Sequence, residues 1–187
     1  MKKYLPIFII ILVLAADQIL KIWVKNHIEI NTSQTIVEDW FYLHFVENNG
    51  MAFGFEFGGS AGKIALTTLR LGVIGFIIYL LAQYQKRGIG YFGLICMSLV
   101  LAGALGNIID SVFYGVVFGY ESLFFGRVVD MLYFPIFKGY LPDYLPFWGG
   151  DYFVFFRPIF NIADAAISVG MFLIILFQKH FFKGITE

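Results

Sequence analysis

Two acidic residues of the sequence, Asp130 and Asp164, lie in strongly apolar surroundings. Asp164 stands at the start of an apolar stretch that continues to about Phe177. An ionised carboxylate at the middle of a bilayer costs roughly 2.5–3.5 kcal/mol on insertion scales, so we expect Asp164 to serve a purpose. We predict that the two carboxyls face each other across a small hydrated pocket and share one proton. Such a pair can activate water for attack on a peptide carbonyl, one carboxyl acting as base and the other as acid.

Other reactive side chains occur in patterns that suit catalysis less well. The single cysteine, Cys96, lies in an apolar run, which excludes an internal disulfide and favours a small core residue over a reactive thiol. His27, His44 and His180 are scattered, with no His-Glu-x-x-His pattern. No serine lies in a Gly-x-Ser-x-Gly pattern. We therefore expect a site that uses neither a metal nor a cofactor.

The composition is that of a membrane protein. The 187 residues are 59% hydrophobic and 14% charged, with a mean hydropathy of +0.79. Four apolar segments, at about residues 5–24, 64–81, 91–113 and 159–177, are each long enough to cross a hydrocarbon core of ~30 Å as a helix. The predicted fold class is an α-helical membrane protein with four transmembrane helices in one domain, residues 1–187. The formal net charge of zero gives no indication of nucleic-acid binding, and we expect a monomer.

The first apolar segment has a second interpretation. Its basic start, apolar run and Ala15-Ala16 pair are also typical of a cleaved signal peptide. We favour a membrane helix because the apolar pattern resumes after Asp17. Asp17 and Lys21 are four residues apart, so they can form an ion pair on one helical face or else extend toward the interface.

The distribution of charge predicts the orientation. With a cytoplasmic N-terminus, the inner ends of the segments carry six basic residues and one acid, whereas nine acids fall in the outer loops. This asymmetry follows the positive-inside rule and places both termini in the cytoplasm. Asp17, Asp110 and Asp164 then lie at a similar depth near the outer face. The inner basic residues are Lys2, Lys3, Lys86, Arg87, Lys179 and Lys183.

The outer connections are predicted to be structured. Within residues 26–62, the alternating, aromatic-rich stretch from Trp40 to Phe57 contains Asn48-Asn49-Gly50, a strong hairpin signal. We expect a small sheet, or cradle, that lies on the outer surface of the membrane with its apolar face down. The long connection of residues 114–158 is rich in aromatic residues and is predicted to be an interfacial cap.

Two segments contain the pattern Asn-x-x-Asp, with Asn107 before Asp110 and Asn161 before Asp164. Residues three apart share one helical face, so each helix is expected to present an amide beside a carboxyl. Gly103 would let another helix approach closely. For Asp110, two interpretations stay open. It either supports the structure or takes part directly in catalysis, and we favour support.

Five stretches, taken together, resemble bacterial lipoprotein signal peptidases (signal peptidase II). They occur in order between the four segments and cover nearly the whole chain. The stretches are Asp17-Gln18-x-x-Lys21, Asn48-Asn49-Gly50-Met51-Ala52-Phe53, residues 103–110, Val128-Val129-Asp130 and residues 160–167.

The resemblance implies an aspartyl endopeptidase of the bacterial inner membrane and a target of globomycin. It would cut prolipoproteins just before the cysteine that carries a diacylglyceryl group, near the periplasmic face. Its partners would be these substrates and membrane lipid. Asp130 and Asp164 match the catalytic dyad of the family. Positions that line or support the family's site match Asp17, Lys21, Asn48, Gly50, Gly103, Asn107, Asp110, Asn161 and Ala163.

The chain departs from the family pattern in two places. Ser111 stands where the family usually has an arginine, and Arg127 or Arg157 could supply a cation instead. The role of Arg70, inside the second apolar segment, is left open. The stretch between Asp130 and Asp164 is also longer than expected, which bears on the shape of the substrate-covering loop.

Two other classes of function are compatible with polar groups on membrane helices. A proton- or cation-coupled transporter would use buried acids as a relay. However, the acids cluster at one face and none lies near the inner side to complete a path. A structural subunit would need such groups only to hold helices together. Cleavage of a precursor that depends on both Asp130 and Asp164 separates the peptidase from both alternatives.

Overall fold

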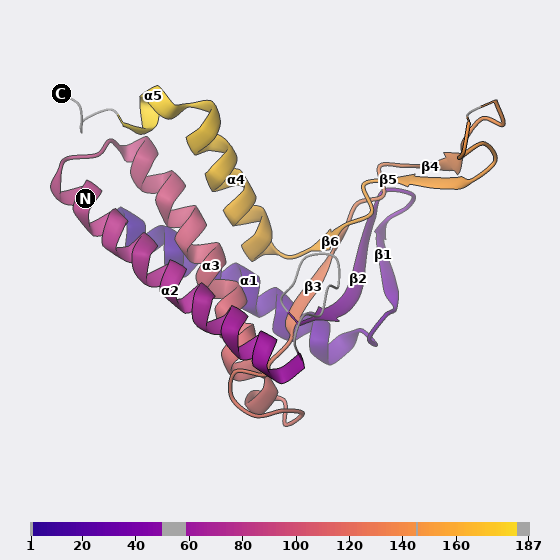
Figure 1. Ribbon diagram of the computed structural model, residues 1–187, viewed down its shortest axis with the longest axis horizontal. Helices are drawn as coiled ribbons and strands as arrows, with labels where there is room; N and C mark the ends of the chain where they lie inside the picture. Colours follow the sequence, from indigo (N-terminus) through magenta and orange to yellow (C-terminus); the bar gives the residue numbers. More distant parts are fainter. Residues whose placement is uncertain (1, 50–58, 145, 183–187) are drawn as a thin grey trace.

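The computed structural model describes residues 2–49, 59–144 and 146–182. Three long apolar helices, α1 (Leu5–His27), α2 (Gly59–Lys86) and α3 (Tyr91–Val117), are long enough to cross a membrane. A shorter apolar helix, α4 (Ile162–Leu176), is followed by α5 (Gln178–Phe181). The four apolar helices pack together, and α1 begins and α5 ends at the same end of this bundle (Figure 1).

The prediction of a fourth helix over residues 159–177 is wrong at its start. Ile159 and Phe160 form the short strand β6, and Asn161 then caps α4. The apolar sequence alone did not distinguish this strand from helix, because short apolar runs fit both. The 15 residues of α4 are fewer than the ~20 that usually span the hydrocarbon core. The first three helices begin or end beyond their predicted limits, and α3 takes in Tyr114–Val117, which we had assigned to a loop.

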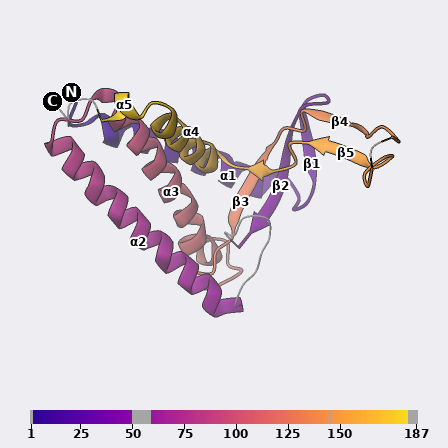
Figure 2. The ribbon, with the colours of Figure 1, turned by 45° about the horizontal axis from the view of Figure 1, so that its top comes forward.

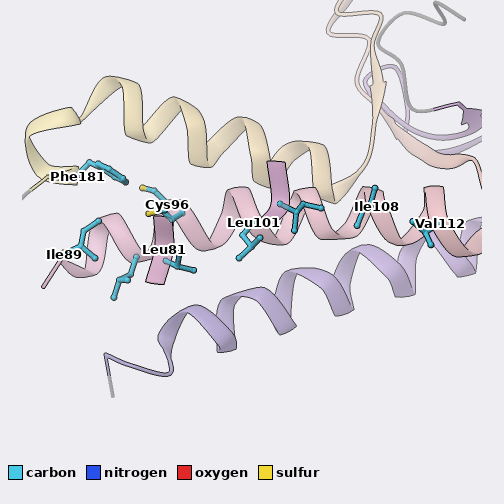
Figure 3. Packing of buried hydrophobic residues seen from close by; sticks show 10 residues of the cluster. Leu81, Ile89, Cys96, Leu101, Ile108, Val112 and Phe181 are labelled. Carbon is cyan, nitrogen blue, oxygen red and sulfur yellow. The ribbon is translucent and has the colours of Figure 1, made fainter. Parts of the chain in front are cut away.

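Helix α3 is the centre of the bundle and has buried residues along its whole length. Figure 3 shows side chains of the main apolar cluster spaced along it, from Ile89 near one end to Val112 near the other. Cys96 belongs to this cluster and is fully buried, as predicted. Gly103 permits the closest approach of α4, since a Cβ atom there would collide with the backbone oxygen of Ala163. The predicted role of this glycine is therefore confirmed.

The outward faces of α1, α2 and α4 are apolar and exposed. This arrangement suits helices whose surroundings are lipid, because only the faces toward α3 need protein partners. The exposed large side chains on these helices include Ile7, Phe8, Ile11, Ile19, Leu69, Phe76, Tyr79, Phe172 and Ile175.

A four-stranded antiparallel sheet lies beside the helices, in the order β1-β2-β3-β6. Its strands β1 (Ser33–Val37), β2 (Phe41–Asn48) and β3 (Val128–Tyr133) join segments that are distant in sequence. The predicted small sheet is thus present, but its hairpin turn joins β1 and β2. The turn expected at Asn48–Gly50 and the run after it fall mostly outside the described residues. The prediction of a loop over residues 114–158 is wrong in part, because strand β3 lies within it.

A second hairpin, β4 (Phe137–Tyr140) and β5 (Tyr152–Phe155), projects beyond this sheet and away from the helices (Figures 1 and 2). Its distal part carries aromatic side chains with little cover, and Phe147 is 93% exposed and Trp148 64% exposed. The extra length between Asp130 and Asp164 is therefore used largely for this aromatic arm.

Candidate active site

A buried lysine joins α1 to α3. Lys21 is 0% exposed, and its Nζ lies 2.9 Å from Asp17 Oδ2 and 2.8 Å from Asp110 Oδ2. It also donates a hydrogen bond of 3.1 Å to Asn107 Oδ1. The predicted pairing of Asp17 with Lys21 is confirmed, and the alternative in which both extend to the interface is wrong. A buried ammonium is tolerated here because two carboxylates and an amide oxygen replace its water.

Asp17 also fixes the beginning of α4. Its Oδ1 accepts a hydrogen bond of 2.9 Å from the backbone N–H of Ala163, one of the helix donors that lack an intrahelical partner. Gly106 of α3 makes room for this contact, since a Cβ atom there would lie 2.8 Å from Asp17 Oδ2 and 2.9 Å from Ala163 Cβ. One carboxylate thus holds α1, α3 and α4 in a fixed relation.

Asp110 contacts the backbone of strand β3. It is fully buried, and its Oδ2 accepts a hydrogen bond of 3.2 Å from Val129 N. Its Oδ1 accepts one of 2.9 Å from Gln18, which in turn accepts one from the hydroxyl of Tyr114. Our site prediction did not include Gln18 or Tyr114. Gln18 could have been suggested by its place beside Asp17, whereas no sequence signal marked Tyr114.

Asn161 connects the two predicted catalytic residues. Its Nδ2 lies 2.7 Å from Asp130 Oδ1, and its Oδ1 accepts a hydrogen bond of 2.8 Å from Asp164 N. The carboxylate of Asp164 reaches back to Asn161 N at 3.3 Å, which completes a capping box. The same amide lies 3.1 Å from Asn107 Oδ1 and 3.2 Å from Val129 O. Asn161 is fully buried, so the hydrogen bonds of its side chain are shielded from solvent.

The two Asn-x-x-Asp patterns differ in outcome. On α3 the amide and the carboxyl do lie side by side, since Asn107 Oδ1 and Asp110 Oδ2 both contact Lys21 Nζ. Asn161 is not part of the helical face but caps it. In addition, Asn107 donates a hydrogen bond across to α4, with its Nδ2 2.7 Å from Asp164 Oδ1. The physical reason is the close packing that Gly103 and Gly106 allow, which brings Asp164 within reach of Asn107. Each asparagine therefore orients an acid through tertiary or capping contacts.

Asp130 lies on β3 and is 4% exposed, as its apolar neighbours suggested. It accepts hydrogen bonds from Asn161 and, at Oδ2, from Asn48 of β2. Burial, followed by the charge of Asp164, raises the pKa of Asp130 to about 7. Asp164 is only partly buried. The two acids therefore occupy different environments although Asn161 contacts both.

The cation opposite Ser111 comes from α2. Arg70 Nη1 lies 3.5 Å from Ser111 Oγ, and its charge interacts with Asp164 and Asp130. Arg127 instead approaches Glu47 at 3.4 Å, and Arg157 is exposed. Neither of the two arginines that we considered for this place is the one that contacts Ser111.

The structure thus gathers ten of the predicted site residues around the start of α4, from the facing sides of α1 and α3 and from the neighbouring strands. Gly50 lies outside the described residues. The residues brought together are Asp17, Lys21, Asn48, Gly103, Asn107, Asp110, Asp130, Asn161, Ala163 and Asp164.

The fold and site define a helical membrane protein with three long apolar helices, a shorter one and a small antiparallel sheet, in which buried polar residues of α1, α3, α4 and β3 contact one another. Residues 9–180 match the family described as signal peptidase (SPase) II, Peptidase_A8. The chain therefore belongs to the signal peptidase II family, whose members are aspartic peptidases.

Similar proteins agree with this assignment. A lipoprotein signal peptidase of Porphyromonas gingivalis is 48% identical, with 90% of this chain and 80% of the relative aligned. One of Amoebophilus asiaticus is 40% identical, with 91% and 76% aligned. A solved structure described as a bacterial membrane enzyme is 28% identical, with a TM-score of 0.63, and covers 93% of this chain and 87% of that chain.

Proposed function

We propose that this signal peptidase II cleaves diacylglyceryl-modified prolipoproteins with Asp130 and Asp164 as its catalytic pair. Removal of signal peptides from prolipoproteins follows from the family and its relatives. The assignment of the pair rests chiefly on one observation. A single buried amide, Asn161, contacts the side chain of Asp130 and caps the helix that presents Asp164. The other eight residues that the structure gathers serve to place these two acids.

The environments of the two acids suggest their roles. Asp164 is partly exposed and lies in the first turn of α4, where the helix dipole and the N–H groups of Asn107 and Asn161 favour a negative charge. Asp130 is buried, and its raised pKa keeps a proton on it up to about pH 7. We therefore assign Asp164 as the general base and Asp130 as the general acid.

The reaction then proceeds by general acid–base catalysis. Asp164 takes a proton from water as the water oxygen bonds to the scissile carbonyl carbon, and Asp130 gives its proton to the carbonyl oxygen. The tetrahedral intermediate collapses when Asp164 gives its proton to the leaving nitrogen. Asp130 recovers a proton from the hydroxyl as the new carboxyl group forms, so the pair ends with one proton, as it began.

Location in the membrane supports a lipid-modified substrate. The chain is a multi-pass protein of the cytoplasmic membrane, and we infer from its basic inner ends that both termini are cytoplasmic. The site would then lie near the periplasmic face, with α4 as the fourth, short span and the sheet as the cradle. We expect a monomer that contacts membrane lipid. The aromatic arm of β4 and β5 would rest at the membrane interface.

The pKa of Asp130 predicts a pH dependence. Below about pH 7 Asp130 retains the proton that the acid must donate, and above it this proton is lost. We expect kcat to fall by about tenfold per pH unit on the alkaline side of the profile. This fall should begin at or slightly above pH 7, because bound substrate would exclude water and raise the pKa of Asp130 further. The test is a pH profile of kcat on folded protein in proteoliposomes. A kcat that is constant to pH 10 would contradict the assignment of Asp130 as acid.

The function itself is tested by cleavage in proteoliposomes of two matched precursors, one with a diacylglyceryl cysteine and one without the lipid. Cleavage of the first just before the cysteine, with little cleavage of the second, is the expected result. Equal cleavage of both would remove the lipid requirement, and cleavage of neither would refute the proposed activity. Ion or solute flux that depends on Asp164 would support the transporter instead.

A further inference from the structure

The polar cluster contains more negative than positive side chains. Asp17, Asp110, Asp130 and Asp164 lie within it, and Lys21 forms ion pairs with the first two. A pair that keeps a single proton still carries one negative charge, and an unbalanced charge in a membrane site is costly. The charge on Asp130 and Asp164 therefore calls for a further cation.

Arg70 is placed to provide this charge. It interrupts the apolar sequence of α2 and is partly buried, although most neighbouring residues of that helix are exposed to the surroundings. Its guanidinium lies 3.5 Å from Ser111 Oγ on α3, and Ser111 in turn donates a hydrogen bond of 3.0 Å to Asn107 O. Asn107 Nδ2 donates a hydrogen bond of 2.7 Å to Asp164 Oδ1. The guanidinium thus lies at the edge of the site, and its charge acts most strongly on Asp164 and next on Asp130.

The neighbouring lysine of α2 is engaged elsewhere. Lys63 Nζ donates hydrogen bonds to Asn49 Oδ1 at 2.9 Å and to Phe125 O at 2.8 Å, so it ties the sheet and a loop to α2. The charge of Lys21 also favours the ionised form of Asp130, but Lys21 forms its ion pairs with Asp17 and Asp110. The charge of Arg70, by contrast, interacts with both proposed catalytic acids.

We propose that Arg70 is a positioning residue that balances the negative charge of the Asp130–Asp164 pair from α2 and so sets the pH range in which the pair holds one proton. This inference rests on the proposed function. An arginine suits the task because its guanidinium stays protonated at every pH in question and can bond Ser111 while its charge acts on the acids. The cation thus comes from α2, while the residue that follows Asp110 on α3 is the uncharged Ser111.

Other charged or titratable groups lie on the elements packed near the pair and must be considered in any pH profile. They stay unchanged in the variants proposed below, so a difference between variants reports on position 70. These groups are Asp17 and Lys21 on α1, Glu47 on β2, Lys63 on α2, and Asp110 and Tyr114 on α3.

The test compares pH profiles of kcat for wild type, Arg70→Gln and Arg70→Lys with the lipid-modified precursor. Without the positive charge, the pair gives up protons less readily. Both limbs of the Arg70→Gln profile should therefore move to higher pH, by roughly 0.5–1 unit, which corresponds to a three- to tenfold change in the ionisation constants. Arg70→Lys keeps the charge and should keep the limbs within about 0.2 unit of wild type. Arg127→Gln, which removes an exposed arginine paired with Glu47, serves as the matched control and should not move the limbs.

A lower kcat with unmoved limbs in Arg70→Gln would show a merely structural role and overturn the inference. If Arg70→Gln fails to fold, Arg70→Lys decides alone. Limbs displaced by about half a pH unit or more in Arg70→Lys, despite the retained charge, would overturn the inference. Failure of the proposed function is distinguishable, since wild type itself would then not cleave the precursor.

Discussion

Replacement of either Asp130 or Asp164 by asparagine is expected to abolish cleavage of the lipid-modified precursor, with kcat at least about 10³-fold lower. An amide at position 164 cannot take a proton from water, and an amide at position 130 cannot give one to the carbonyl oxygen. The loss should lie in kcat, with little change in KM, because both groups act mainly in the transition state. Accumulation of uncut precursor, followed by gel mobility, measures it.

These variants should still fold. The ion pairs of Lys21 do not involve either acid, and an asparagine oxygen can still accept a hydrogen bond from Asn161 or Asn107. Asp143→Asn is the matched control, since it neutralises an exposed acid in the connection between the same two residues and should cleave like wild type. Cleavage at more than a tenth of the wild-type rate by Asp130→Asn or Asp164→Asn would refute the catalytic assignment.

The second large effect is expected on stability, from Lys21→Met. Methionine fills a similar volume but leaves the carboxylates of Asp17 and Asp110 buried without their cation. Breaking a buried ion pair by removing one partner typically costs about 3–5 kcal/mol, and here one cation serves two acids. We therefore expect a markedly lower free energy of unfolding and weak activity, because Asn107 Oδ1 also loses one of its two donors and keeps only Asn161.

Thermal unfolding in detergent or resistance to proteolysis measures this loss. Lys86→Met removes an exposed lysine at the end of α2 and should change the free energy of unfolding by less than about 0.5 kcal/mol. Neutralising the acids as well, in Asp17→Asn/Lys21→Met/Asp110→Asn, should recover part of the stability, since the uncompensated charges are then gone. A Lys21→Met protein as stable as wild type would show that the buried triad is not required.

The sequence predicted the general fold and most of the site because both depend on strong local signals. Long apolar runs indicate membrane helices whatever their neighbours are, and charged residues inside such runs are too costly to occur without a partner. The spacing of Asp17 and Lys21 left two possibilities, an ion pair or extension toward the interface, and the structure contains the ion pair. The resemblance then named the residues that the structure gathers around the start of α4.

Features that depend on tertiary contacts could not be predicted in this way. Residues 159–160 look like the start of an apolar helix, yet they form a strand because β3 offers a partner for them. Asn107 lies beside Asp110 as the spacing predicts, but the approach of α4 also brings Asp164 to its amide, which the sequence did not predict. The location of Arg70 opposite Ser111 depends on how α2 packs on α3, which no local pattern specifies.

The central claim is that Asp130 and Asp164 activate a water molecule and form no covalent bond to the substrate. Single-turnover cleavage in water enriched in oxygen-18, with mass spectrometry of the released signal peptide and of the enzyme, tests it most directly. The account predicts one heavy oxygen in the new carboxylate of the signal peptide and none in either aspartate. A first turnover that releases unlabelled peptide and leaves the label, or a trapped acyl group, on Asp130 or Asp164 would contradict it.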